Sequence, residues 1–171
     1  TANDAVDSWC AATNVYAGDR GTPGAPNPAC SHLDRAVDHC RLLGDAGATG
    51  FADAGVAFEV EVEELGLTDL TPRVDSSPEL VIEIGNAAGN VDPSAPETFT
   101  WVRATPLPGY EAPVGSHADV WRGEVIAPAG TRRVMARASR DGGASWRYCD
   151  RDGSDNGVSL DQLTTLVIGV S

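Results

Sequence analysis

Lysine is absent from this chain, so all 12 basic residues are arginines, and 25 acidic residues outnumber them. The net charge is therefore −13. Nucleic acid and anionic lipid both require a basic surface, so this charge excludes them as expected partners. The acidic balance is typical of a strongly solvated surface, and it also suits a protein that binds divalent cations.

Long apolar runs are missing as well. No stretch approaches the roughly 20 residues of a membrane-spanning helix, and no basic segment followed by an apolar one opens the chain. We therefore expect no membrane insertion, and we interpret Thr1 as the first residue of a processed, secreted protein.

The sequence also lacks the motifs of common enzyme mechanisms. It contains no G-x-S-x-G elbow, no H-E-x-x-H helix and no glycine loop of the kind that holds phosphate. His117 follows Ser116, but adjacent side chains on a strand point to opposite faces. The many carboxylates could supply a glycosidase pair, yet a sandwich of 171 residues offers no evident cleft for one. We expect a protein without catalytic activity.

Glycine (19) and proline (11) are spread along the chain, which favours many short strands joined by turns. From Val56 to Val62 apolar residues alternate with glutamates, a pattern that predicts a strand with one face in water. Further strands are expected near Val37 and at 79–85, 98–105, 118–126, 131–139, 145–149 and 163–170, with 128–130 as a hairpin-type connection. The sequence thus predicts an all-β fold, an antiparallel immunoglobulin-like or fibronectin-like β-sandwich of seven to eight strands.

Residues 1–36 differ in composition from the rest and are too rich in turn residues to build a core. We divide the chain into an irregular N-terminal arm, 1–36, and a sandwich, 37–171. Such an arm could add a strand to the open sheet edge of a neighbouring copy.

Four cysteines, Cys10, Cys30, Cys40 and Cys149, allow three disulfide pairings. We favour Cys10–Cys30, which closes a loop within the arm, together with Cys40–Cys149, which ties the first core strand to the strand that holds Trp146. Each bridge would stabilise the fold by about 3 kcal/mol. The alternative is a zinc site built from Cys30, His32, His39 and Cys40, which an exported context disfavours.

The segment Ser139–Gly157 holds the most candidate site residues. Asp141-Gly142-Gly143 predicts a tight turn. The strand that follows would place Trp146 and Tyr148 on one face and Arg147 and Cys149 on the other.

An aspartate loop comes directly after this strand. Asp150, Asp152 and Asp155 offer oxygen ligands at spaced positions on a glycine-containing loop, an arrangement that calcium tolerates. The loop lacks the terminal bidentate glutamate of an EF-hand, and Asp161 is only a loose substitute. The alternative is a turn in which the aspartates bond their own backbone. Calcium is therefore a candidate ligand, and no cofactor is required.

Aromatic residues could form a platform on which sugar rings stack. The candidate residues are Trp146, Tyr148, Asn156 and Tyr110. In a sandwich of this size, however, one or two tryptophans are expected in the core beside a disulfide, and Trp101 and Trp146 are our candidates for that role. Tyr110, in a loop with prolines, is the ring we expect to be exposed.

Five pieces of the chain carry a family resemblance: VDHC, GLTDLTP, IGNAAGNVDPSAPETFTWV, RASRDGGASWRYCDRDGSDNG and LTTLVIG. Together they resemble an uncharacterised immunoglobulin-like module of secreted proteins from myxobacteria and their relatives. The resemblance implies that Cys40 and Cys149 are paired and that the module is an accessory domain without known chemistry. The fourth piece is similar, more distantly, to starch-binding immunoglobulin-like modules, with Val158 where those have a tyrosine.

These observations lead to two expectations about function. The first is a secreted, non-catalytic structural or adhesive protein, a subunit of an extracellular surface assembly that joins other copies of itself into an oligomer or filament. The second is a carbohydrate-binding accessory module, stabilised by calcium, whose partner is a surface polysaccharide.

Overall fold

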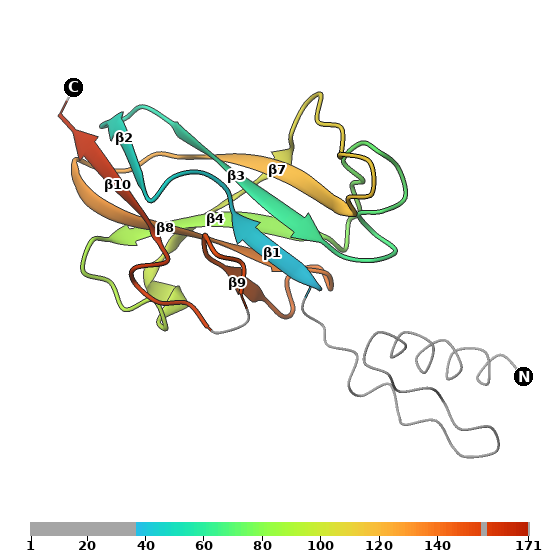
Figure 1. Ribbon diagram of the computed structural model, residues 1–171. Helices are drawn as coiled ribbons and strands as arrows, with labels where there is room; N and C mark the ends of the chain where they lie inside the picture. Colours follow the sequence, from blue (N-terminus) through green and yellow to red (C-terminus); the bar gives the residue numbers. More distant parts are fainter. Residues whose placement is uncertain (1–36, 155–156, 171) are drawn as a thin grey trace, which may run out of the picture. The chain divides into compact units, whose positions relative to one another are not determined.

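The computed structural model describes residues 37–154 and 157–170, and over these residues the fold is a β-sandwich (Figure 1). Its strands are β1 (His39–Leu42), β2 (Gly47–Phe51), β3 (Val56–Glu63), β4 (Val81–Ala88), β5 (Thr100–Arg103), β6 (Thr105–Pro106), β7 (Ala118–Val125), β8 (Gly130–Ser139), β9 (Arg147–Cys149) and β10 (Thr164–Gly169). The described residues also include a single turn of 3₁₀ helix, Pro96–Thr98, and none of their helices is long and apolar enough to cross a bilayer.

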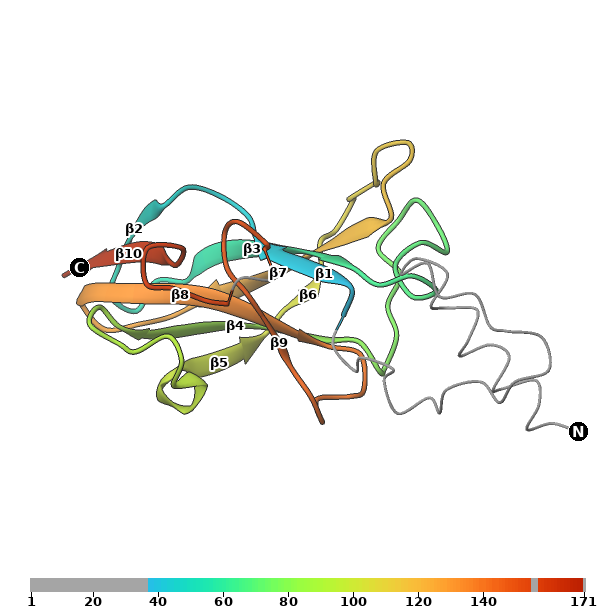
Figure 2. The same ribbon diagram turned by 60° about the horizontal axis from the view of Figure 1, so that its bottom comes forward.

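The strands form two sheets that face each other (Figure 2). The first has the order β1-β3-β7-β6, and the second has the order β2-β10-β8-β4-β5, with β9 also paired to β8. The chain changes sheet after β1: β1 lies antiparallel to β3, whereas β2 lies parallel to β10. This order matches the four-stranded and the larger sheet of an immunoglobulin domain, and it confirms the predicted fold class. Each of the eight expected strands is present, and β2 and β6 are additional.

The core fills the space between the sheets. In β3 the alternating residues Phe58, Val60 and Val62 are buried, and the glutamates between them face outward, as the pattern predicts. From the second sheet Ile84 and Leu166 pack against them. A second, smaller cluster lies on the outer face of the second sheet, where the loop before β5 and the segment before β10 cover it; its buried members are Ala87, Phe99, Met135 and Leu163.

Two expectations are wrong. The connection at 128–130 is not a hairpin, because β7 belongs to the first sheet and β8 to the second. The chain crosses the sandwich there. The tryptophan buried in the main core is Trp121, at 4 % exposure, whereas Trp101 and Trp146 are half-buried. Trp121 occupies an inward position of β7, while Trp101 lies on the outer face of the second sheet.

Strands β9 and β10 share the same side of β8. Residues Gly130–Val134 of β8 pair with β10, and Ala136–Ala138 pair with β9. β9 ends at Cys149 and β10 begins at Thr164, so residues 150–163 connect them. The position of the last immunoglobulin strand is therefore filled by two short strands with a loop between them.

The predicted Cys40–Cys149 disulfide is confirmed. It joins β1 of the first sheet to β9 of the second, with a Cα–Cα distance of 5.4 Å and a sequence separation of 109. Because Cys40 is held in this bridge, it is not available to the alternative zinc site. The predicted Cys10–Cys30 bridge, and His32 of that alternative site, lie outside the described residues.

Candidate functional site

An arginine stacked between two tryptophans lies on the outer face of the second sheet. The guanidinium carbon of Arg137 is 4.1 Å from the ring centroid of Trp101 and 4.0 Å from that of Trp146. Glu83, its cross-strand partner, accepts hydrogen bonds from Nε and Nη2 of Arg137 at 2.7 and 2.5 Å. The cation is thus neutralised by a carboxylate and covered by aromatic rings on two sides.

Most of the surface of Trp101 is occupied by protein. Its indole lies over Gly85, and the indole Nε1 donates to the carbonyl of Pro96 at 3.1 Å. The rings of Phe99 and Tyr148 lie beside it, with centroid distances of 5.6 and 6.2 Å. Arg137 covers a further part of the ring, so little of Trp101 remains for a sugar to stack on.

The four predicted sugar-binding residues do not form one platform. Trp146 and Tyr148 belong to this cluster and share the outer face, as the alternation predicts, whereas Cys149 points inward. Tyr110 belongs to the other side of the sandwich, in the loop between β6 and β7. Its hydroxyl lies 3.4 Å from the carbonyl of Ala118, and burial raises its pKa. The ring is half-buried rather than exposed. Asn156 lies outside the described residues.

The aspartate loop forms hydrogen bonds within itself. Asp150 is buried and its Oδ1 accepts the N–H of Gly153 at 3.0 Å; burial raises its pKa. Asp152 accepts the backbone N–H of Ser154 at 2.8 Å and the amide of Gln162 at 2.5 Å. The pKa of Asp152 is lowered to about 2, mainly by its hydrogen bonds from Ser154. These contacts match the alternative of a turn that bonds its own backbone.

Two further observations concern the calcium prediction. Among residues 37–154 and 157–170, no three His, Cys, Asp or Glu side chains converge as a metal-binding group. Asp155, the third predicted ligand, lies outside the described residues. The calcium site therefore stays a prediction that rests on the sequence of the loop.

The aspartate loop belongs to the connection between β9 and β10, residues 150–163, and the two ends of this connection are held close together. The backbone N–H of Arg151 donates to the carbonyl of Gln162 at 3.2 Å, and its Nη2 donates to the carbonyl of Asp161 at 2.8 Å. On the other side, Leu42 of β1 donates its N–H to the carbonyl of Asp150 at 2.6 Å. The loop thus begins and ends beside the strands that the disulfide joins.

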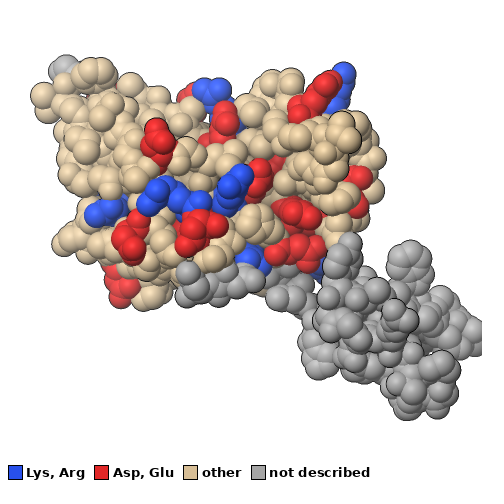
Figure 3. Space-filling view, viewed as in Figure 1, with Lys and Arg blue, Asp and Glu red and all other residues tan. Residues whose placement is uncertain are grey.

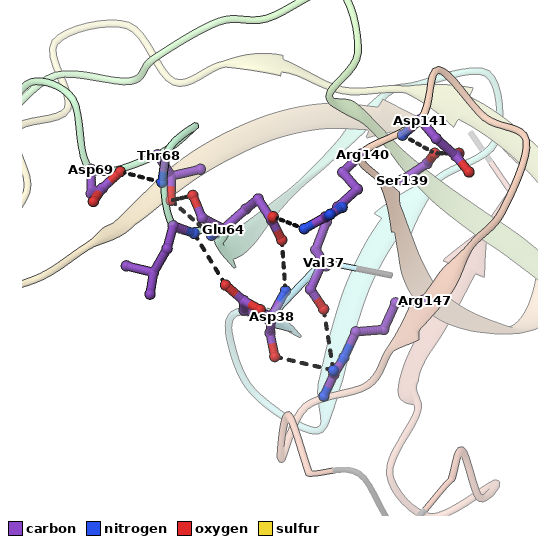
Figure 4. A network of polar contacts seen from close by, with 11 residues as sticks. Val37, Asp38, Glu64, Thr68, Asp69, Ser139, Arg140, Asp141 and Arg147 are labelled. Atoms are coloured by element: carbon purple, nitrogen blue, oxygen red, sulfur yellow. Dashed lines mark hydrogen bonds and ion pairs between the residues drawn. The ribbon is translucent and has the colours of Figure 1, made fainter. Parts of the chain in front are cut away.

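A buried carboxylate anchors the start of β1 (Figure 4). Glu64 directly follows β3 and is 2 % exposed; it forms an ion pair with Arg140 and accepts the N–H of Asp38 at 3.0 Å. Burial is the largest cause of its raised pKa. Arg147 of β9 donates to the carbonyls of Val37 and Asp38 at 3.3 and 3.1 Å. Residues from three separate parts of the chain therefore meet at the point where the sandwich begins.

Sequence reasoning missed Glu64, although a signal for it was present. Phe58, Val60 and Val62 define the inward positions of β3, and Glu64 is next in that series. A glutamate at an inward position requires a cationic partner. The pattern could therefore have pointed to Glu64, but not to Arg140 as its partner.

Strand β2 is an open edge of the second sheet. The carbonyl of Ala46 and the N–H of Ala52 bond to β10, so the alternating backbone groups of Gly47 and Thr49 point away from the sheet. No residue of β2 is charged. Phe51 at its end is 61 % exposed, and Val167 and Val170 beside it are 48 % and 80 % exposed.

The other sheet edges carry the features that usually block strand addition. β1 carries Arg41, β5 ends at Arg103, and the two-residue β6 contains Pro106. Figure 3 shows acidic and basic side chains interspersed over one face of the molecule, whereas the region where Figure 1 places β2 and the end of β10 is almost entirely tan. β2 is therefore an edge that neither charge nor proline protects.

Comparison with known proteins adds little to this geometry. Neither the family models nor the curated proteins compared with this chain match it. Among solved structures, a chain described as "Cyclomaltodextrinase" is similar at 12 % identity and a TM-score of 0.43; the match covers 74 % of this chain and 19 % of that chain. The identity and the TM-score are both too low for this match to bear on function. The resemblances drawn from the sequence motifs stay predictions.

Proposed function

We propose that this protein is a secreted, non-catalytic structural or adhesive module that joins other copies of itself in an extracellular assembly. The observation that carries the proposal is the open, uncharged edge strand β2. An exposed edge of this kind is a template on which a further strand can pair through its backbone. The Cys40–Cys149 bridge supports the extracellular part, because disulfides persist in oxidising compartments.

The strand that we propose to pair with β2 comes from residues 1–36 of another copy. This segment is far longer than the five residues of β2, and residues 37–154 and 157–170 form both sheets of the sandwich without it. Such a contact joins two different surfaces, so each copy can both give and receive a strand. Contacts of this type produce rings or filaments rather than a closed dimer.

The test is the oligomeric state of the whole chain, measured by light scattering over a wide concentration range and by electron microscopy. Thr49→Lys places a charge on the open edge and is expected to shift the protein toward monomer. Thr100→Lys, at an exposed position on the opposite edge strand β5, is the matched control and should leave assembly unchanged. A wild-type protein that stays strictly monomeric at high concentration would sink the proposal.

Carbohydrate binding is the second candidate, and one observation favours it. Trp146 is half-buried rather than enclosed, and it shares the outer face of the second sheet with Tyr148. A titration with α-glucans followed by tryptophan fluorescence tests this role. Quenching that Trp146→Ala abolishes, while Tyr110→Phe leaves it intact, would support a site on this face. No response to any polysaccharide would count against it.

A further inference from the structure

We infer that tension applied between the two ends of the sandwich passes through the Cys40–Cys149 bridge and bypasses strands β2 to β8, so that the disulfide sets how far this module can be stretched. The inference concerns the fold of a single chain and does not depend on the proposed assembly.

The position of the bridge within the chain is the first reason. Cys40 is the second residue of β1, the first strand, and Cys149 is the last residue of β9. The sequence separation of 109 encloses all of β2 to β8. A pull on the chain before β1 therefore passes along the backbone to Cys40 and from there through the disulfide to Cys149. The enclosed residues cannot be extended by this pull while the bridge is intact.

Non-covalent contacts support the bridge at the same place. Arg147, two residues before Cys149, donates to the carbonyls of Val37 and Asp38, and Glu64 accepts the N–H of Asp38. Figure 4 shows these groups converging on the residues that lead into β1. The strand is thus held at its first residues as well as at Cys40, which opposes peeling of β1 from β3.

What remains on the tension path is the segment after Cys149. The contacts between Arg151 and Gln162 hold the two ends of the aspartate loop together, so these bonds must break before the loop can extend. Behind them lies β10, which pairs with β2 on one side and β8 on the other. Leu166 and Ile168 of β10 are buried in the core.

The direction of the pull also follows from the fold. Figures 1 and 2 both place the C-terminal end of β10 and the start of β1 toward opposite ends of the sandwich. Tension between these points therefore runs roughly along β10. Pulling along a strand loads its hydrogen bonds together rather than one after another, so we expect β10 to leave in a single event.

The bridge makes the extensible length depend on redox state. With the bridge intact, Asp150–Gly169 can extend by at most about 7 nm at roughly 3.5 Å per residue. Reduction proceeds by thiol–disulfide exchange: an external thiolate attacks one sulfur, forms a mixed disulfide with it and releases the other cysteine as a thiolate. The enclosed residues are then freed, which adds about 38 nm.

Single-molecule force-clamp measurements on the full chain, held by its two ends, test the inference. The variant Cys10→Ser with Cys30→Ser leaves Cys40–Cys149 as the only possible bridge. We expect this variant without reductant to show a short extension of about 7 nm from the sandwich. Dithiothreitol should then produce an additional step of about 38 nm at a rate that rises with thiol concentration.

A second variant checks the assignment. Cys40→Ser with Cys149→Ser should release about 45 nm without reductant. If this variant does not fold, the thiol-dependent step of the first variant still decides the question. A release of about 45 nm from the bridged protein without reductant, or the absence of the 38 nm step after thiol addition, would overturn the inference.

Discussion

The indole of Trp101 lies directly over the α-carbon of Gly85, its partner across strands β5 and β4. A Cβ added at position 85 would come within 2.6 Å of two ring carbons of Trp101. We expect Gly85→Ala to lower the free energy of unfolding by about 1–3 kcal/mol, because the ring and its neighbours must shift to admit the methyl group. Urea denaturation measures the change. Gly47→Ala is the control, since its nearest neighbour would lie at 3.9 Å. Equal losses in both variants would contradict this account.

Arg137→Lys should cost about 1 kcal/mol of stability. A lysine ammonium is a compact point charge, so it cannot lie flat between Trp101 and Trp146 while it also donates two bonds to Glu83. The near-ultraviolet circular dichroism of the tryptophans should change with it. Arg103→Lys, at an exposed position of β5, is expected to alter neither quantity. If both substitutions behave alike, the stacked arginine is not a stabilising element.

Arg140→Met is expected to destabilise the protein by about 2–3 kcal/mol, because it leaves the carboxylate of Glu64 buried without its cation. Adding Glu64→Gln to this variant should recover part of the loss, since the glutamine can still accept the N–H of Asp38 without a charge. A double-mutant cycle on chemical denaturation gives the coupling. Additive effects of the two substitutions would show that the ion pair contributes nothing.

The strands of the main core could be predicted from the sequence, because local alternation identifies them. Val56–Val62 predicted β3, and its glutamates face outward. Period-two alternation does not say which face of a strand is inward, however. For this reason the alternation could not show that Trp121, rather than Trp101 or Trp146, lies in the main core. Nor does it say which sheet a strand joins, so the sequence around 128–130 predicts a hairpin where the chain in fact crosses to the other sheet.

Strand β2 and the polar networks depend on parts of the chain that are distant in sequence. Gly47–Phe51 contains two glycines and shows no apolar alternation; it becomes a strand because β10 pairs with it. Local alternation predicts that Trp146 and Tyr148 share one face, but it gives no sign that Arg137 of β8 lies between Trp146 and Trp101. The contacts of Glu64 with Arg140, 76 residues away, are likewise set by the sandwich as a whole.

Stability should also depend on pH through Asp119, which is fully buried on β7. Its Oδ2 accepts the N–H of Asp75 at 2.7 Å, and its Oδ1 has no hydrogen-bond partner among the described residues. Burial raises the pKa of Asp119 to about 6. The native state therefore holds this proton more tightly than the unfolded state, and stability should rise by about 1 kcal/mol as the pH falls from 7 to 5.

Below pH 4 the trend should reverse. The pKa values of Asp141 and Asp152 are lowered by hydrogen bonds from nearby backbone and serine groups, so protonating these carboxylates at low pH removes stability. Melting temperature measured from pH 7 to pH 3 tests both limbs of this curve, the rise in stability between pH 7 and 5 and the fall below pH 4. Asp119→Asn should flatten the upper limb and leave the lower one in place. An unchanged upper limb would show that another group titrates there.

The parallel pairing of β2 with β10 has a consequence for how the chain is made. β2 ends at Phe51, but its partner β10 ends only at Gly169. During synthesis on the ribosome, β2 therefore cannot pair until almost all of the sandwich has been made. Cys40 likewise cannot form its disulfide until Cys149 has been synthesised. During this interval both an unpaired strand and a free thiol are exposed to other chains. We therefore expect efficient maturation to require that nascent copies be kept apart until translation ends.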